Sequence, residues 1–343
     1  MEEKSIETLG EFGLIDHLTR NSKQFSTSTH LGVGDDCAVL MANDEEYLLV
    51  SKELLLEGIH FDLTYVPLSH LGFKAVSASV SDIYAMNGKP TQVLVGLGVS
   101  SRFTLEAVDS LYEGIHRAAA MYGVDLVGGD TTSSVNGLTL SVTVLGSVAK
   151  GKITYRKGAS VNDILMVSGD LGRAYLGLQV LEREKAVFMA NPTIQPELDA
   201  FDFLVKKQLM PEARKDVVEV LAALGVTPTS MIDISDGLAS EIFHLCTQSN
   251  LGIELYEEKI PIDPQTFERA MEFGIDPTVA ALSGGEDYEL LFAIDIADYE
   301  KVKNNPLVTV IGHFTPKDNG YYLVAKDGSK HELKAQGWNA LKK

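Results

Sequence analysis

Residues Leu31–Leu40 read LGVGDDCAVL, which places two adjacent carboxylates, Asp35 and Asp36, between two glycines and an apolar run. Adjacent like charges repel, and burying them is costly unless a cation neutralises them. Taken alone, the pair is typical of a solvent-exposed Gly-Asp turn. Further acid-plus-glycine stretches follow along the chain, however. They favour an interpretation in which the chain is organised around a shared acidic site that holds cations, with Asp36 as its first member.

The other members of the predicted site are oxygen donors next to glycines or at strand ends. A single Asp in such a place is more often a helix N-cap or a turn residue, and Asp236 before Gly237 suits that role. Six donors in recurrent settings are harder to explain as caps. Because Mg²⁺ prefers a few carboxylates together with water and phosphate oxygens, they indicate a magnesium-dependent polyphosphate site. The six are Asp36, Glu53, Asp82, Asp130, Asp233 and Asp236.

The composition excludes several classes of protein. The 343 residues include 29 Lys and Arg against 48 Asp and Glu, a formal net charge of −19. Nucleic acids and anionic membranes need a basic face, so neither is expected as a partner, whereas metal ions that mask carboxylates still allow a small anionic substrate. Cys37 and Cys246 fit no disulfide framework or metal spacing and are expected to be small apolar residues. With no signal peptide and no apolar run of about 20 residues, a cytosolic protein is expected.

Helix and strand patterns are mixed along the whole chain. Leu68–Met86 lies between Pro67 and Asn87-Gly88, which are typical helix boundaries. Further helices are expected over 6–23 and 104–122, after 172, after 214 and up to 249, with a surface connection at 187–196. Strands are expected over 47–50, 91–99, 124–127, 138–148, 164–167, 230–234, 252–256, 289–294, 308–312 and 321–325. The strand at 124–127 is expected to end in a glycine-rich turn at 128–132.

This mixture predicts an α/β or α+β class. The length is too great for one ordinary core and suits two domains. The Gly- and Lys-rich stretch Lys150–Ser160 predicts the boundary, which gives domains at 1–150 and 151–343.

Several common nucleotide-binding motifs are absent from the sequence. It has no G-x-x-x-x-G-K-[ST] phosphate loop, no G-x-G-x-x-G dinucleotide turn, no protein-kinase catalytic loop and no H-E-x-x-H zinc site. None of the eight histidines are spaced as a metal pair. The commonest nucleotide folds are therefore not expected, and metal ions would supply the positive charge that a polyphosphate needs.

Nine stretches occur in the order GEFGLIDHL, GDDCAVL, LLLEGIHF, SVSDIYAMNG, VGGDTTSS, LTLSVTVLG, RKGAS, MIDISDGL and SGGEDYELLF. Together they resemble the thiamine-monophosphate kinase family, part of the aminoimidazole-ribonucleotide-synthetase-like ATP-binding superfamily. The resemblance runs from about Leu9 to Trp338. MIDISDGL and GGEDYELLF are specific to this family and its close relatives, whereas GDD and GGD alone would be weak.

The resemblance implies an enzyme that transfers the γ-phosphate of ATP directly to thiamine monophosphate, with several Mg²⁺ ions, giving thiamine diphosphate and ADP. The physical task is to align two anionic groups and to cancel their repulsion. The resemblance also implies a two-domain synthetase-like fold with the site in the cleft between the domains. The N-terminal ATP- and Mg-binding domain would form a barrel across a homodimer, and the C-terminal domain would be a three-layer α/β sandwich.

The resemblance also assigns roles to individual residues. Arg156 would pair with ATP phosphates, and the ring of Trp338 suits stacking on the cationic thiamine heterocycle. Plainer alternatives are a core aromatic residue for Tyr112, an exposed loop arginine for Arg156, a turn residue for His60 and a surface-packed tail residue for Trp338. The implied Mg²⁺ ligands are Asp36, Ser51, Glu53, Asp82, Asp130, Asp233 and Asp236. The implied ATP contacts are Tyr112, Gly129, Asp130, Arg156 and Ser235, and the implied contacts to thiamine monophosphate are His60, Glu286 and Trp338.

The sequence departs from the family at Ser51-Lys52-Glu53, where the family has a Thr/Ser-Thr-Asp run that supplies metal ligands. Glu53 keeps the charge but is one methylene longer. If Lys52 points inward, its ammonium either replaces a metal's charge near phosphate or weakens metal binding. If it points outward, little changes.

Sister activities and a non-catalytic protein are the alternatives. A hydrogenase-maturation dehydratase uses a C-terminal cysteine, which the tail GWNALKK lacks, and Cys37 does not match the reactive residue of selenophosphate synthetase. Aminoimidazole ribonucleotide synthetase is not expected to carry GGEDYELLF and the Trp ending. A non-catalytic nucleotide- or metal-binding protein, which Lys52 makes conceivable, would bind ATP without Mg²⁺-dependent turnover.

Overall fold

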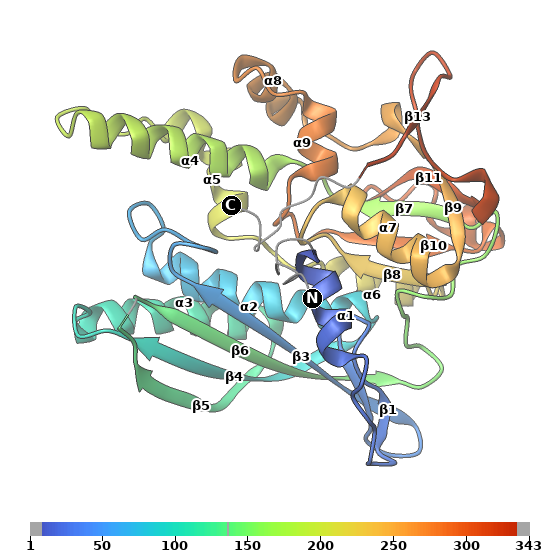
Figure 1. Cartoon of the computed structure of the whole chain (residues 1–343), viewed down its shortest axis with the longest axis horizontal. Coiled ribbons are helices and arrows are strands. Elements are labelled where there is room, and N and C mark those ends of the chain that lie inside the picture. The colour runs from blue at the N-terminus through green and yellow to red at the C-terminus, as the bar shows by residue number, and fades with distance from the viewer. Residues whose placement is uncertain (1–8, 136, 335–343) are drawn as a thin grey trace, which may run out of the picture.

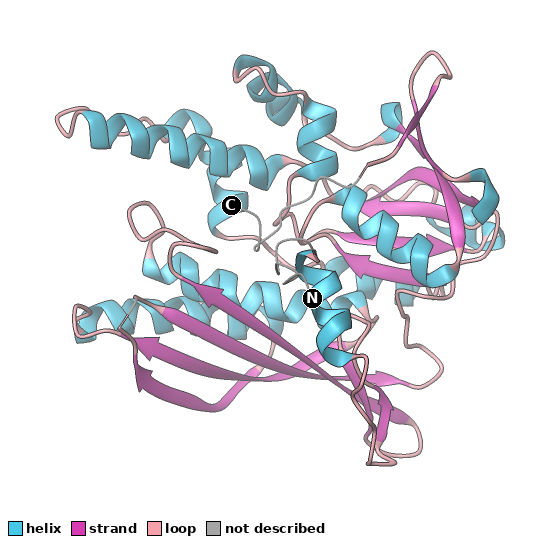
Figure 2. Ribbon diagram, in the orientation of Figure 1, coloured by secondary structure: helices cyan, strands magenta, loops and turns pink. Residues whose placement is uncertain are grey.

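The computed structural model describes residues 9–135 and 137–334, which form two β-sheets flanked by helices (Figures 1 and 2). A six-stranded sheet lies in the first half of the chain and a seven-stranded sheet in the second. The chain is therefore a two-domain mixed α/β protein, as the mixture of patterns predicts. Among the described residues, no helix combines the length and the apolar character needed to cross a membrane.

The first sheet consists of β1 (Thr29–Leu31), β2 (Ala38–Met41), β3 (Glu46–Leu56), β4 (Lys89–Val99), β5 (Asp125–Ser133) and β6 (Thr139–Ala149). Their order is β1-β2-β3-β6-β4-β5, and the pairs are antiparallel except for β4 with β5. Helices α2 (Leu68–Ala85) and α3 (Leu105–Tyr122) lie against one face (Figure 1), where Leu49, Val93 and Val142 are buried. The opposite face carries Lys52, Leu54, Gly96 and Ser141, and we call it the open face.

Helices α2 and α3 cross in backbone contact. A Cβ atom on Gly72 would lie 2.0 Å from the carbonyl oxygen of Leu111, and one on Gly114 would lie 1.9 Å from that of Ser69. Only glycine leaves room for so close an approach. Because α2 also carries Asp82, this crossing fixes the helix that brings a predicted ligand to the site.

The second sheet is covered by helices on both faces. Val167 and Leu291 pack against α7 (Leu238–Ser249) on one face, and Met166 and Phe292 pack with Val217 of α6 (Lys215–Ala223) on the other. These are the three layers that the sequence analysis expects. The strands, in the order β13-β12-β9-β11-β7-β10-β8, are β7 (Ile164–Ser168), β8 (Ser230–Asp233), β9 (Leu251–Tyr256), β10 (Leu290–Ile294), β11 (Val308–Pro316), β12 (Tyr321–Val324) and β13 (Lys330–Glu332).

Two of the remaining helices, α4 and α5, bring the two halves together. Leu176 of α4 and Leu204 of α5 belong to the same buried core as the first sheet, and α5 contacts α2. Parts of the second half therefore lie directly against the helix that carries Asp82. The remaining α-helices are α1 (Gly10–Thr19), α4 (Arg173–Ala190), α5 (Asp202–Leu209), α8 (Pro264–Glu272), α9 (Pro277–Ser283) and the short α10 (Tyr299–Val302).

The predicted elements are largely confirmed, but several bounds are wrong: helix α1 ends at Thr19 and not at Lys23, and strand β11 continues to Pro316. Strand β3 continues to Leu56 instead of ending at Val50, and helix α4 continues to Ala190, into the expected surface connection. Strand β5 continues to Ser133, so Gly128–Thr132 is strand and not a turn. Pairing with β4 explains this last difference, because a neighbouring strand holds Gly129 and Asp130 extended despite their turn propensity.

Candidate active site

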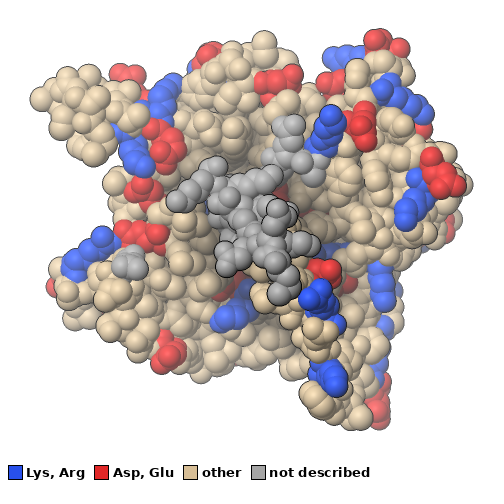
Figure 3. Space-filling model, in the orientation of Figure 1, with Lys and Arg blue, Asp and Glu red and all other residues tan. Residues whose placement is uncertain are grey.

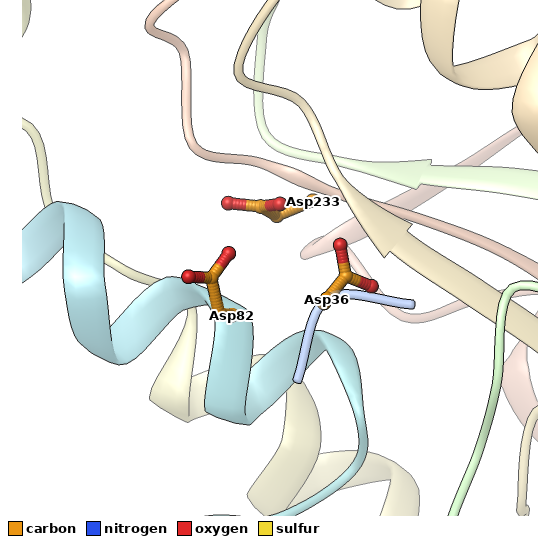
Figure 4. A group of neighbouring side chains, drawn as sticks. All are labelled: Asp36, Asp82 and Asp233. Atoms are coloured by element: carbon orange, nitrogen blue, oxygen red, sulfur yellow. The ribbon is translucent and has the colours of Figure 1, made fainter. Parts of the chain in front are cut away.

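Three predicted ligands meet at one point between the two halves. Asp36 comes from the loop before β2, Asp82 from α2 and Asp233 from the end of β8 (Figure 4). Each offers one carboxylate oxygen, and these oxygens all lie within 4.8 Å of one another. Asp36 and Asp233 are buried, and Asp82 is partly buried. Carboxylates this close and this dry need protons or a cation between them.

Two serine hydroxyls orient this trio. Ser51 of β3 donates a hydrogen bond to Oδ2 of Asp82, and Ser81 of α2 donates to Oδ2 of Asp233 at 2.6 Å. Ser81 was not among the predicted site residues. Its signal in the sequence is its place directly before Asp82 in the SVSD stretch.

Arg156 holds the third carboxylate. Its Nε and Nη2 atoms donate to Oδ1 of Asp36 at 3.1 and 2.5 Å, and its backbone N–H donates to the Asp35 carboxylate at 3.2 Å. Burial works against the charged guanidinium, but the adjacent Asp36 charge raises the pKa of Arg156. Oδ2 of Asp36 is buried and has no hydrogen-bond partner. An unpartnered carboxylate oxygen beside two further carboxylates fits a metal ion.

The protonation of the clustered carboxyls depends on their burial, on the neighbouring acids and on whether a cation is bound. Burial, together with the Asp36 charge, raises the pKa of Asp233 to about 7, and burial with the Asp236 charge raises that of Glu53 to about 7. Burial and the neighbouring acids raise the pKa of Asp82 well above its usual range. Carboxyls of this kind keep protons near neutral pH unless a cation replaces them.

The trio lies in a cavity of about 800 Å³ between the halves. Its lining includes the guanidinium-bearing Arg156 and eight acidic residues; Lys52 also borders it, although its Nζ is held by Ser141. On the face shown in Figure 3, acidic and basic side chains are interspersed, so this concentration of acids belongs to the cavity and is not a general surface feature there. The acids are Glu11, Asp35, Asp36, Glu53, Asp82, Asp233, Asp236 and Glu286. Ser51 and Ser235 line the same cavity.

Two predicted substrate contacts, His60 and Glu286, line the cavity as well. The backbone N–H of Leu56 donates to Nδ1 of His60 at 3.1 Å, so the ring proton of neutral His60 is on Nε2. Burial lowers the pKa of His60, although the charge of Glu286 opposes this shift. His60 is therefore a neutral donor at neutral pH. Trp338 lies outside the described residues.

Lys52 points away from the carboxylate trio. Ser51 and Glu53 face the cavity, and since side chains alternate along a strand, the side chain of Lys52 lies on the opposite, open face. Its Nζ donates to Oγ of Ser141 at 2.5 Å. The outward alternative of the sequence analysis is the one observed, so Lys52 leaves the trio's metal site unobstructed.

Asp130 is separated from the trio by the width of the sheet. Leu54, Ser141, Gly96 and Asp130 are opposite one another on successive strands, so Asp130 lies three strand spacings, about 14 Å, from Leu54. Gly129 and Asp130 line a second hollow, of about 780 Å³, on the open face together with Lys52. A further shallow hollow on β5 includes Tyr112. Within one chain, these three predicted nucleotide contacts lie outside the acidic cavity.

Comparisons with known proteins give the family. Residues 34–148 match the family model of the AIR synthase related protein N-terminal domain, and residues 160–324 match that of its C-terminal domain. The thiamine-monophosphate kinase of Bacillus subtilis is 32% identical, with 97% of this chain and 100% of that protein covered. The enzyme of that name from Aquifex aeolicus is 33% identical, with 97% and 98% covered.

A solved structure, AaThiL complexed with AMPPCP and TMP, superposes with a TM-score of 0.84 at 30% identity and covers 99% of both chains. The match therefore spans both sheets and the cavity between them. Full-length identity above 30% to two proteins of one name also decides between this family and the sister activities considered from the sequence. The chain belongs to the thiamine-monophosphate kinase family.

Proposed function

We propose that the acidic cavity is the active site in which this chain transfers the γ-phosphate of ATP directly to thiamine monophosphate. The observation that carries the proposal is the meeting of Asp36, Asp82 and Asp233 within 4.8 Å, in a cavity whose lining also includes His60 and Glu286. Family membership supplies the reaction, because relatives over the full length carry this name. The complex of AaThiL with AMPPCP and TMP supports the pairing of a nucleotide with that acceptor.

The trio, with Ser51, Glu53 and Asp236 beside it, would hold Mg²⁺. The unpartnered Oδ2 of Asp36 and the raised carboxyl pKa values support this assignment, because a buried, crowded group of carboxyls is what a bound cation would stabilise. Bound Mg²⁺ would neutralise the phosphate oxygens that must approach one another.

Arg156 and Ser235 are the chain's own contacts to ATP. Two N–H groups of Arg156 bind Oδ1 of Asp36, which orients the guanidinium in the cavity wall and leaves its other N–H groups for phosphate oxygens. The backbone carbonyl of Ser235 accepts from the N–H of Glu286 at 2.8 Å, and the N–H of Ser235 donates to Glu241, so the backbone of Ser235 is fixed in the cavity wall. At the acceptor end, we assign His60, Glu286 and Trp338 to thiamine monophosphate.

A homodimer would complete the nucleotide site. Strand β2 pairs with β3 only up to Val50, so residues 51–56 have a sheet edge that β2 leaves open, and β5 is the last strand of the sheet order. Joining these two edges across a two-fold axis would close a barrel over the open faces. It would also bring Gly129 and Asp130 of the partner subunit next to Ser51-Lys52-Glu53. We therefore propose that Tyr112, Gly129 and Asp130 act in the partner's cavity.

The test is product formation. The purified protein is incubated with ATP, Mg²⁺ and thiamine monophosphate, and thiamine diphosphate and ADP are separated by chromatography. The proposal predicts equal amounts of both products, and their loss on addition of a chelator. ATP binding measured by calorimetry, with no thiamine diphosphate formed, would contradict it.

A further inference from the structure

A buried lysine of the first domain reaches into the acceptor end of the cavity. Lys74 lies on α2 within the apolar stretch LGFKAVSASV and is only 4% exposed. Its Nζ lies 2.7 Å from Oε1 of Glu286 and donates to the backbone carbonyl of Gln208 at 3.1 Å. Because a buried ammonium is costly unless it is paired, the ion pair with Glu286 is needed to keep Lys74 charged in this position.

Gln208 of α5 holds the other oxygen of the same carboxylate. Its Nε2 donates to Oε2 of Glu286. A carboxylate only accepts hydrogen bonds, so the amide nitrogen must face Glu286 and the amide oxygen must point away; that Oε1 atom is buried without a partner. Gln208 itself is buried, at 5% exposure. Each carboxylate oxygen of Glu286 therefore has one fixed donor.

The backbone of Glu286 is constrained as well. Its φ of +65° lies in the left-handed region, which residues other than glycine adopt only where their surroundings hold them there. Its N–H donates to the carbonyl of Ser235 at 2.8 Å. Yet 30% of its side chain remains exposed, and it lines two adjoining cavities together with His60. The carboxylate is thus rigid and accessible at once.

The pairing also changes what Glu286 recognises. An unpaired carboxylate attracts cations, whereas the Lys74 ammonium cancels that charge and leaves lone pairs that accept N–H donors. The aminopyrimidine ring of thiamine carries an exocyclic amine, which is a neutral donor, beside ring nitrogens, which are acceptors. Glu286 therefore presents an acceptor that matches the amine donor of that ring.

We propose that Lys74 and Gln208 are positioning residues that fix Glu286 and neutralise it, so that it selects the acceptor substrate by the amine of its pyrimidine ring. This inference rests on the proposed function, since it names what the acceptor end of the same site recognises. Lys74 comes from one domain and Gln208 and Glu286 from the other. The contact therefore also aligns the two walls of the cavity.

The first test separates the acceptor from the nucleotide. Lys74→Met keeps the length and the buried packing but removes the charge. It is expected to raise the KM for thiamine monophosphate at least about tenfold, with the KM for ATP unchanged and kcat within about threefold. Lys74→Arg should recover part of the loss, and Lys74→Met combined with Glu286→Gln should cost no more than Glu286→Gln alone. Lys330→Met, which breaks the exposed Lys330–Glu254 pair, is the matched control and should change neither KM.

The second test measures selectivity directly with oxythiamine monophosphate, in which oxygen replaces the amine. The wild type should prefer the amine-bearing substrate in kcat/KM, and Lys74→Met or Gln208→Leu should reduce that preference at least about tenfold. If Lys74 and Gln208 had a merely structural role, the substitutions would lower kcat/KM equally for the two substrates. Unchanged KM and unchanged preference in both folded variants would overturn the inference while wild-type turnover stands. Absence of wild-type turnover would instead overturn the proposed function. If Lys74→Met does not fold, Gln208→Leu provides the same test.

Discussion

Buried carboxyls that keep their protons near neutral pH link the stability of this protein to pH and to metal. Glu53 and Asp233 have pKa values of about 7 in the folded chain, against ordinary values of 4.5 and 3.8. Between those values, the folded state binds more protons than the unfolded state. The free energy of unfolding therefore falls as pH rises through this window, and the loss is complete above about pH 7.

This gives a prediction at the residue scale. In a chelator, the melting temperature should fall by about 5 °C or more between pH 5.5 and pH 8. Mg²⁺ should restore most of the loss at pH 8 and little at pH 5.5, because it binds the ionised carboxylates. Scanning calorimetry measures both effects. Glu53→Gln, which cannot ionise, should flatten the pH dependence, whereas a metal-free melting temperature that rises with pH would contradict the assignment.

Among the elements, the crossing of α2 and α3 determines where Asp82 and Lys74 lie. Gly114→Ala would place a methyl group 1.9 Å from the carbonyl oxygen of Ser69, so α2 must move. We expect a loss of about 2–4 kcal/mol in the free energy of unfolding, measured by urea titration, together with reduced turnover.

Gly151→Ala is the matched control for that variant. A Cβ atom there meets nothing within 4 Å, so its stability should stay within about 0.5 kcal/mol of the wild type. If Gly114→Ala were equally stable, the close helix crossing would not be a determinant of the site.

The elements also show how far local sequence patterns extend. Helices α2 and α3 match their predicted ranges within one residue, because Pro67, Thr104 and Gly123 are local boundary signals. The extension of β5 through Gly129 and Asp130 was missed, because pairing with β4 is a tertiary effect that no local pattern records.

For the site, the recurrent acid-plus-glycine settings predict that Asp36, Asp82 and Asp233 share a cation site although they lie far apart in the sequence. The family resemblance adds the individual ligand roles, and only the structure shows which of the six donors meet. Lys74 and Gln208 were missed because a lone lysine in an apolar helix and a glutamine near a helix end carry no motif. Only the packing of α5 on α2 gives them a role.

For the whole molecule, the separation of Asp130 from the trio leads to a subunit-mixing experiment. Asp82→Asn and Asp130→Asn should each be inactive alone. If Asp130 serves the partner's cavity, mixed dimers of the two variants contain one site with both changes and one intact site. Mixing equal amounts under conditions of subunit exchange should then restore about a quarter of wild-type activity.

Two outcomes would contradict a site that is shared across the dimer. Activity that stays at background after mixing, with subunit exchange verified by a tag, would mean that Asp130 does not act across the dimer. A wild-type protein that is monomeric by light scattering at assay concentrations would exclude the shared site altogether.

The most direct measurement of the central claim is the formation of thiamine diphosphate from ATP and thiamine monophosphate by wild type, Asp82→Asn and Asp318→Asn, side by side over a range of Mg²⁺ concentrations. Asp318 lies in a short 3-10 helix, Lys317–Asn319, does not line the cavity and is the matched control. The account predicts Mg²⁺-dependent product from wild type and Asp318→Asn, and a fall of at least about 100-fold for a folded Asp82→Asn. Wild-type rates in Asp82→Asn would contradict it.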